Sequence, residues 1–254
     1  MATGTARVEP GPQDVAQVIR LICAIERRDI LSQEEREVLA STISSIRTVP
    51  AGTILVRSHQ TINESTLLLE GFVARQYDQQ TGQREITALH VPGDFLDLHS
   101  LTLKMLDHDV VALTPARVAT APHERLRRVT ETHPHLTRLL WFLTTVDAAM
   151  HRQWIAMLGQ AAAGRVAHLI CELQMRLELV GLASETEFAL PLTQIDIGDM
   201  TGLTSVHVNR TVRKLREAKL VDIRGGHVTI PDLFALRGFA EFDPSYLYMK
   251  REPS

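Results

Sequence analysis

The residues best suited to bind a polyanion lie together in one short stretch, residues 204–219. This stretch has five basic side chains and one acidic side chain, a local charge of +4, whereas the whole chain has a net charge of −3. The charged residues are Arg210, Arg213, Lys214, Arg216, Lys219 and Glu217. Neutralising nucleic-acid phosphates releases counterions, so a positive segment on a mildly acidic protein favours DNA binding. The alternative is a solvated amphipathic helix whose basic side chains need no partner.

Two short helices joined by a glycine turn would present these side chains. Thr193 and Asp196 have the spacing of a capping box at the start of the first helix, and Gly202 marks its end. Thr204 is suited to cap the second helix. The apolar stripe of the first helix is Ile195, Ile197 and Met200, and that of the second is Val208, Val212 and Leu215. The opposite face of the second helix then carries the candidate DNA contacts Ser205, Val206, His207, Asn209, Arg210, Arg213 and Lys214.

A two-stranded hairpin is predicted directly after the second helix. Residues 220–223 and 227–230 alternate as half-buried strands do, around the turn Arg224-Gly225-Gly226. Arg224 and His227 would lie where a wing meets the phosphate backbone. A helix-turn-helix followed by a wing predicts a DNA-binding domain over residues 159–254.

Acidic residues and histidines crowd a second stretch, residues 94–109. Carboxylate and imidazole ligands suit Zn, Fe or Mn, so a cupin-like jelly-roll metalloprotein, or a metal- or haem-dependent sensor, is the alternative function. A cupin would need a His-x-His pair, which this stretch lacks, and a solvated loop explains the same residues. The members are Asp94, Asp97, His99, Asp107, His108 and Asp109. No nucleophile–His–acid grouping or phosphate-binding glycine loop is evident, so we do not expect an enzyme.

Short β-rich runs punctuated by Gly, Pro and Asn extend from Ile46 to about Pro122. Strands recurring every 8–12 residues or so are typical of a sandwich or jelly roll, here a β-roll of about eight strands. We place this domain at residues 15–132. Within it, helices are predicted over residues 15–27 and, capped by Ser32 with Glu35, over residues 32–44. Residues 1–14 form a disordered tail.

One long helix, residues 133–158, is predicted to join the two domains. Its apolar positions recur at heptad spacing, which favours pairing with the same helix of a second copy. The seam is Leu136, Leu140, Leu143, Asp147, Met150, Trp154 and Met157. A second face, with Leu139, Phe142 and Val146, could pack on the chain's own β-roll. Asp147 is discordant, because a carboxylate in a seam needs a partner.

Composition places the chain among ordinary globular proteins. It has 254 residues, of which 44% are hydrophobic and 22% charged. No apolar run reaches the roughly 18 residues of a membrane helix, and the N-terminus lacks a signal-peptide core, so we expect a cytoplasmic location and no membrane partner. Cys23 and Cys171 are the only cysteines, too few for a four-cysteine metal or iron–sulfur site in one chain. Cys171 is interpreted as a buried core residue.

This order of elements resembles the catabolite activator/FNR (CRP/FNR) superfamily of regulators from about residue 15 to 240. The matching motifs are Pro50–Gly52, Leu69–Val73, Pro92–Phe95, Gly164–Ala167, Leu192–Gln194, Gly202–Thr204 and Val208–Arg210. The segment Phe242–Leu247 resembles a branch common in alphaproteobacteria. The resemblance implies an α+β fold: a cyclic-nucleotide-binding-like jelly roll, a dimerisation helix and a winged helix-turn-helix.

The resemblance also implies a function. Family members are homodimers that bind pseudo-palindromic double-stranded DNA and act on RNA polymerase. Their base-contacting positions correspond here to Val206, Asn209 and Arg210, and their phosphate-binding positions to Thr193 and Gln194. Valine replaces the usual acidic base contact, so it would meet a thymine methyl rather than cytosine, whereas an Arg is suited to guanine.

The sensor region departs from the family pattern. Cyclic-nucleotide members have a Gly-Glu pair where this chain has Asp97-Leu98, and an Arg-Ser pair that grips phosphate where it has His108-Asp109. A carboxylate at an anion site repels the anion, so we do not expect cyclic AMP to bind. An effector is a possibility, but no cofactor is indicated. The candidate effector pocket comprises Asp97, Leu98, His99, His108 and Asp109, with Met150 and His151 of the long helix. Alternatively, Met150 packs in the seam and His151 lies on the surface.

Overall fold

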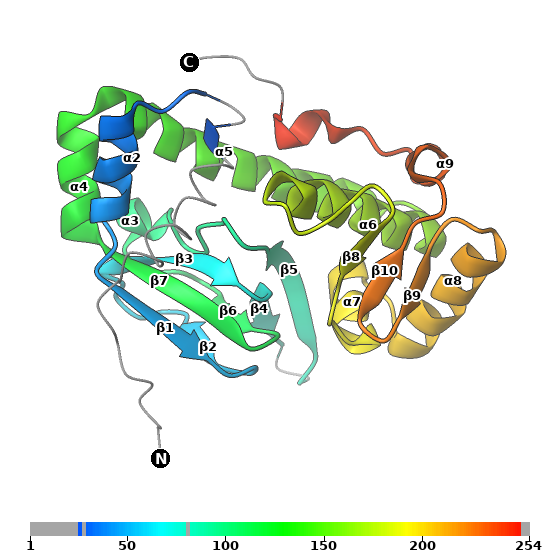
Figure 1. Cartoon of the computed structure of the whole chain (residues 1–254). Coiled ribbons are helices and arrows are strands. Elements are labelled where there is room, and N and C mark those ends of the chain that lie inside the picture. Colours follow the sequence, from blue (N-terminus) through cyan, green and yellow to red (C-terminus); the bar gives the residue numbers. More distant parts are fainter. Residues whose placement is uncertain (1–24, 27–28, 80–81, 250–254) are drawn as a thin grey trace. The chain divides into compact units, whose positions relative to one another are not determined.

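The computed structural model describes residues 25–26, 29–79 and 82–249. The predicted tail 1–14 and most of the predicted helix 15–27 lie outside them. The described residues divide into two compact units, one formed by those up to residue 76 with 89–147 and 249, and the other by those within 77–88 and 148–248. Figure 1 labels their helices and strands.

Two antiparallel sheets form the β-roll. One has the order β1-β7-β3 and the other β2-β6-β4-β5. The strands are β1 (Ser45–Val49), β2 (Ile54–Val56), β3 (Glu64–Glu70), β4 (Val73–Asp78), β5 (Arg84–His90), β6 (Asp109–Ala112) and β7 (Ala116–Pro122). Sequence analysis predicted about eight strands, and the described residues of this region form seven. The acidic stretch forms a loop and the short helix α3 (Ser100–Leu103).

A glycine separates β3 from β4. Gly71 has a φ of +90°, and a Cβ there would lie 2.5 Å from the Pro115 carbonyl oxygen. The positive φ disfavours any residue with a side chain at this position, and a Cβ would also clash with the Pro115 carbonyl oxygen. The chain turns at this glycine and passes from β3 in the first sheet to β4 in the second.

Helices cover the first sheet of the roll. They are α2 (Gln33–Ser41), α4 (His123–Thr132) and the first part of α5 (Pro134–Met157). The predicted capping box of α2 is confirmed, since the Glu35 N–H donates to the Ser32 hydroxyl and the Ser32 N–H donates to Glu35. The core between helices and sheet includes Leu67, Leu126, Leu136, Leu139 and Leu140.

The predicted seam of α5 does not face outward. Leu136 and Leu140 are buried in the core of their own unit, and Trp154 and Met157 are buried in the other unit. The exposed apolar side chains lie one position further along the helix, where Trp141 is 72% exposed and Ile155 is 71% exposed. Both faces have the same heptad spacing, so periodicity alone did not distinguish them. The β-roll core accounts for the burial of Leu136 and Leu140 in the predicted seam.

Asp147, the discordant residue of the seam, has the partner it requires. Its Oδ2 lies 2.7 Å from Nη1 of Arg75 on β4. The Arg75 side chain is almost fully buried, and its Nε and Nη2 also donate to the Leu96 carbonyl oxygen at 3.0 and 2.7 Å. The ion pair therefore connects α5 to the β-roll within one unit.

The second unit contains a three-stranded sheet and several helices. The sheet has the antiparallel order β8-β10-β9. The elements are α6 (Ala162–Leu179), β8 (Glu187–Ala189), α7 (Gln194–Thr201), α8 (Ser205–Glu217), β9 (Asp222–Arg224), β10 (His227–Thr229), α9 (Leu233–Phe239) and the 3₁₀ helix η1 (Pro244–Leu247). The predicted two-stranded wing thus gains a third strand. β8 was missed because its one buried side chain, Phe188, lies in a polar segment.

Candidate nucleic-acid interface and sensor region

The N-terminus of α7 is capped as predicted. The Asp196 N–H donates to the Thr193 hydroxyl at 3.1 Å, and the Thr193 N–H donates to the Asp196 carboxylate at 2.8 Å. Thr193 and Gln194 are exposed at this end of the helix, where backbone N–H groups favour an anion. Of the predicted apolar stripe, Ile197 and Met200 are buried, whereas Ile195 is exposed.

The turn between α7 and α8 depends on two glycines. Gly202 has a φ of +64° and ends α7, as predicted. Gly198 was not singled out, yet a Cβ there would lie 2.4 Å from the Leu203 carbonyl oxygen. A glycine in the middle of a helical pattern is the sequence signal for such a close approach. Arg165 of α6 donates to the Thr201 carbonyl oxygen at 2.7 Å, which fixes the turn against α6.

Helix α8 separates a buried face from an exposed basic face. Thr204 caps it by accepting the His207 N–H, and Val208, Val212 and Leu215 are buried, all as predicted. On the other side Ser205 is half-buried. The exposed residues are Val206, His207, Asn209, Arg210, Arg213 and Lys214. Residues 206, 209, 210 and 213 recur at helical spacing and therefore share one face.

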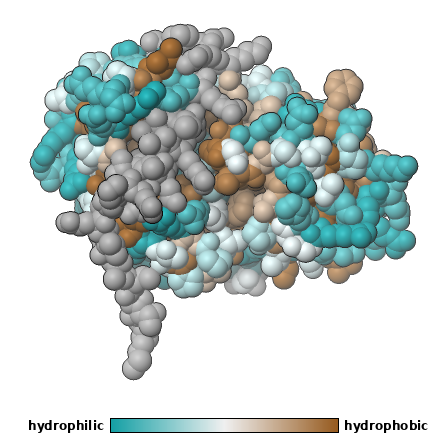
Figure 2. All heavy atoms as spheres, in the orientation of Figure 1, coloured by the Kyte–Doolittle hydropathy of each residue, from teal (hydrophilic) through white to brown (hydrophobic). Residues whose placement is uncertain are grey.

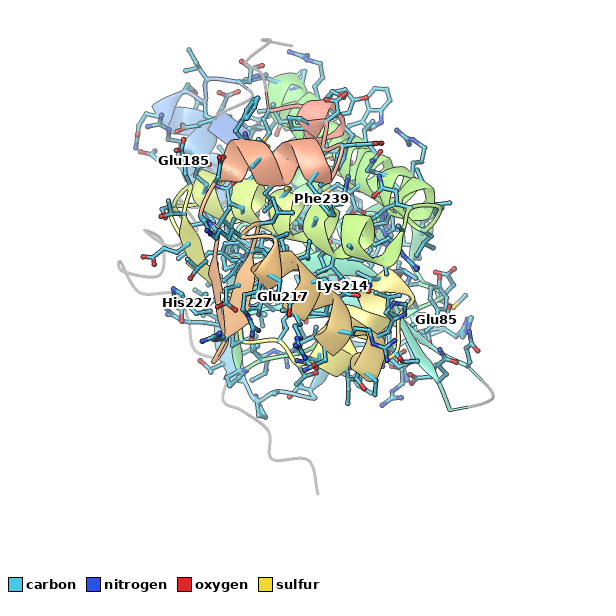
Figure 3. All side chains as sticks on the ribbon, turned by 90° about the vertical axis from the view of Figure 1, so that its right-hand side faces the viewer. Glu85, Glu185, Lys214, Glu217, His227 and Phe239 are labelled. Carbon is cyan, nitrogen blue, oxygen red and sulfur yellow. The ribbon has the colours of Figure 1, made fainter. Side chains whose placement is uncertain are left out.

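Figure 3 shows the outer side of α8, with Lys214 and Glu217 labelled, beside the strand that bears His227. Arg213 lies 2.9 Å from Glu217, but both side chains are mostly exposed, so this ion pair contributes little and leaves the guanidinium accessible. Figure 2 shows hydrophilic residues gathered over the end of the chain that carries α8 and β9.

The wing turns at Gly225 and Gly226, which both have positive φ values. Positive φ at both central residues is the geometry of a type I′ hairpin turn. Arg224 is largely exposed but lies 3.0 Å from Asp222, which also accepts from Arg216 at 2.7 Å. Part of the positive charge near the wing is therefore already paired within the chain.

The acidic residues of α7 are neutralised by Arg84 of β5, which belongs to the same compact unit. Its guanidinium lies 2.6 Å from both Asp196 and Asp199. Burial opposes the charged form of Arg84, but the two carboxylates outweigh burial and raise its pKa. Helix α7 therefore presents less negative charge than its sequence suggests.

In the other unit, Asp97 and Leu98 are both buried. The Asp97 Oδ1 accepts the Thr66 N–H at 2.6 Å, whereas its Oδ2 is buried without a hydrogen-bond partner. Burial raises the pKa of Asp97 to about 7, although Arg75 favours the charged form. Asp97 thus stands within the protein interior rather than on a solvated loop.

Three histidines lie in the same region. The rings of His99 and His108 have centroids 5.8 Å apart, and the His108 Nδ1 lies 2.8 Å from Asp107. Burial lowers the pKa of His90 and of His99 to about 4, and Arg75 adds to both shifts. The structure therefore brings two neutral imidazoles, of the buried His90 and the half-buried His99, close enough to the buried Arg75 guanidinium for its charge to act on both. His90 and Arg75 were missed by sequence analysis, although a lone Arg within the apolar run of β4 was a visible signal.

The remaining candidates are more dispersed. Asp109 accepts the Ser58 N–H at 2.7 Å, so its carboxylate holds a loop. Met150 and His151 are half-buried and belong to the other unit. Among the described residues, no group of three or more His, Cys, Asp or Glu side chains could hold a metal ion, and the metal-sensor alternative is not favoured. Nor is any described helix both long and apolar enough to cross a membrane.

Both halves of the chain match known family models. Residues 46–133 match the cyclic nucleotide-binding domain, and residues 164–239 match the Crp-like helix-turn-helix domain. Similar proteins include the anaerobic regulatory protein of Haemophilus influenzae, which is 24% identical over 81% of this chain and 80% of its own length. The transcriptional activator FnrA of Stutzerimonas stutzeri is also 24% identical, over 83% of this chain and 86% of its own.

A solved structure shares the fold. FixK2 from Bradyrhizobium japonicum superposes with a TM-score of 0.69 at 22% identity, covering 76% of this chain and 96% of its own. The curated relatives are named as regulators or transcriptional activators and not as enzymes.

Proposed function

Because the chain belongs to the CRP/FNR family of DNA-binding transcription regulators, we propose that it acts as a homodimer on a pseudo-palindromic DNA site, which it contacts through α8. The main support for this proposal is the exposed basic face of α8, because the opposite face of this helix is buried in the core. A two-fold axis would place two such helices about 34–36 Å apart, one turn of DNA.

The exposed side chains suit distinct roles at the DNA. Arg210 has the paired donors that bind guanine O6 and N7, and Val206 offers a methyl contact to thymine. Asn209 lies between them on the same face. Thr193 and Gln194, at the N-terminus of α7, are placed to bind phosphate. Lys214, one helical turn beyond Arg210, would meet the backbone rather than a base.

The dimer contact we propose is the exposed stripe of α5. It contains Trp141, Ala148 and Ile155, which recur at the heptad spacing of paired helices. Burying such large exposed apolar side chains against a second copy removes them from water. This stripe replaces the sequence-predicted seam, in which Leu136, Leu140, Trp154 and Met157 are buried within the chain itself.

We propose a domain division into a β-roll at residues 15–132, the dimerisation helix at 133–158 and the DNA-binding domain at 159–254. The β-roll either senses a small molecule other than cyclic AMP or serves only as a scaffold. Its buried cation, Arg75, already binds Asp147 and the Leu96 carbonyl oxygen. The protein would work in the cytoplasm, with RNA polymerase as a partner and without enzymatic activity.

Two single substitutions test the role of α8. Arg210→Ala should cost about 1–3 kcal/mol on the selected site and reduce discrimination between related sites, because it removes a base contact. Lys214→Ala, the matched control on the same helix, should weaken all DNA to a similar extent. Gel-shift titration against the selected site and random DNA measures both. Equal weakening of both DNAs by Arg210→Ala would show that this residue does not contact bases.

A further inference from the structure

The core of the DNA-binding unit contains a buried carboxylate with partners from three elements. Glu172 of α6 is fully buried. It accepts the indole N–H of Trp154 at 3.1 Å and Arg176 Nη1 at 3.0 Å. The Tyr246 hydroxyl donates to it at 2.7 Å. Such a buried charge is tolerated only when donors surround it, so the position of each partner matters.

The third donor comes from the segment after the wing. In Figure 1 this segment, α9 and η1, runs along α6. Tyr246 stacks on His168 of α6, with ring centroids 5.9 Å apart, and Phe242 meets the same imidazole edge-on at 5.1 Å. Burial, aided by Glu172, raises the pKa of the Tyr246 hydroxyl, which therefore stays protonated and acts as a donor. Leu247 is buried beside it in the chain.

The partners in this cluster belong to different helices. Trp154 belongs to the last turn of α5, separated from α6 by the short linker 158–161. Helix α6 in turn supports the DNA-contacting helices, since Arg165 binds the last turn of α7. Any rotation of α6 about the linker would therefore displace α8 from the end of α5, and would separate Glu172 from Trp154.

We propose that Tyr246 is a positioning residue that sets the spacing between the two α8 helices of the dimer. By completing the donor set of Glu172, it holds α6 at one angle to the end of α5. In a dimer paired through α5, that angle determines how far apart the two copies of α8 lie. This inference rests on the proposed homodimer, and it assigns to the segment Phe242–Leu247 a role in choosing between DNA sites.

The test uses the full chain and a palindromic duplex selected in vitro with the wild-type protein. A second duplex has one base pair inserted at its centre, and a third has a single half-site. Tyr246→Phe removes only the hydroxyl and keeps the ring, so the fold should persist, as circular dichroism would verify. Trp154→Phe removes the donor from α5. Tyr248→Phe, at an exposed tyrosine two residues further on, is the matched control.

We expect Tyr246→Phe and Trp154→Phe to reduce the affinity ratio between the selected and the lengthened duplex at least fivefold. Affinity for the half-site should stay within twofold of wild type, because the contact face of α8 is unchanged. An unchanged ratio in both folded variants would overturn the inference, even if the melting temperature fell. A wild-type selection that returned only half-sites would instead overturn the proposed dimeric binding, and this inference with it.

Discussion

Asp97 stands where cyclic-nucleotide-binding members of the family have a Gly-Glu pair. The structure places it in the interior, with one carboxylate oxygen bonded to the Thr66 N–H and the other without a partner. Burial raises its pKa to about 7 from an ordinary value of 3.8. Folding therefore binds a proton that the unfolded chain has lost at the same pH.

This proton makes stability depend on pH in a defined direction. The stabilising effect of protonated Asp97 is complete below about pH 4 and is lost as pH rises through about 7, with a slope of up to about 1.4 kcal/mol per pH unit. Asp97→Asn lacks this proton. The free energy of unfolding of the variant should therefore rise relative to that of wild type as pH increases from 4 to 7, and the difference between the two proteins should stay constant above pH 7. Urea denaturation at several pH values measures the difference.

The comparison of Asp97→Asn with wild type is needed because several histidines change the free energy of unfolding with pH in the opposite direction. The pKa values of His90, His99 and His123 are lowered to about 4. Each therefore stabilises the fold above about pH 6.5, and this effect is lost as pH falls through 4. These contributions are common to both proteins and cancel. Curves that are parallel from pH 4 to 8 would contradict the assignment of the proton to Asp97.

Among the described elements, α5 carries an exposed apolar stripe that includes Trp141 and Ile155. Trp141→Glu combined with Ile155→Glu should dissociate the dimer, because carboxylates would face each other across the two-fold axis. Sedimentation velocity should show monomers at micromolar concentration, with a matching fall in affinity for the palindrome. Leu103→Glu, at an exposed leucine of α3, is the control and should leave the dimer intact. A double variant that remains dimeric would place the subunit contact elsewhere.

The strand β5 influences the helix-turn-helix through one side chain. Arg84→Ala removes the counter-charge of Asp196 and Asp199, so both carboxylates would repel DNA phosphates near α7. We expect about fivefold weaker DNA binding at low salt, or about 1 kcal/mol, and a smaller effect at high salt. Arg117→Ala on β7 is the control. Fluorescence anisotropy over a salt series measures the DNA affinity. An unchanged or increased affinity of Arg84→Ala would contradict the prediction.

Element by element, the sequence predicted those features that depend on neighbouring residues. The caps at Thr193 and Thr204 and the glycine turn at Gly202 are local, and the structure confirms them. The outward face of α5 was predicted wrongly because its heptad pattern fits either of two adjacent faces. The choice depends on the β-roll core, which is distant in sequence.

Long-range polar partners could not be predicted for the same reason. Arg75 and Asp147 are 72 residues apart, and spacing says nothing about a contact over that length. A charged residue in a seam showed only that a partner was required. In the candidate pocket, sequence analysis found Asp97 through its position in the family pattern and His99 through the crowding of acidic residues and histidines. It missed His90, which no motif marks.

For the whole molecule, the main prediction concerns its effector. Cyclic AMP should neither bind nor change DNA affinity, because the family resemblance implies that His108 and Asp109 take the place of the phosphate-gripping Arg-Ser pair. A neutral imidazole offers at most one donor where a guanidinium would offer several charged ones. Calorimetry on ligand-free protein, with DNA titrations in parallel, measures this. Saturable micromolar binding coupled to tighter DNA binding would restore a cyclic-nucleotide sensor.

The buried Glu172 also has a consequence for the time course of synthesis. Its partner Tyr246 lies 74 residues further along the chain, whereas Trp154 precedes it by only 18. At about 5–20 residues per second, a ribosome would need about 4–15 s to add the segment between Glu172 and Tyr246. Throughout that interval the Glu172 carboxylate of α6 lacks the hydroxyl of Tyr246, one of its three donors. The β-roll can therefore mature on the ribosome well before the DNA-binding unit can close.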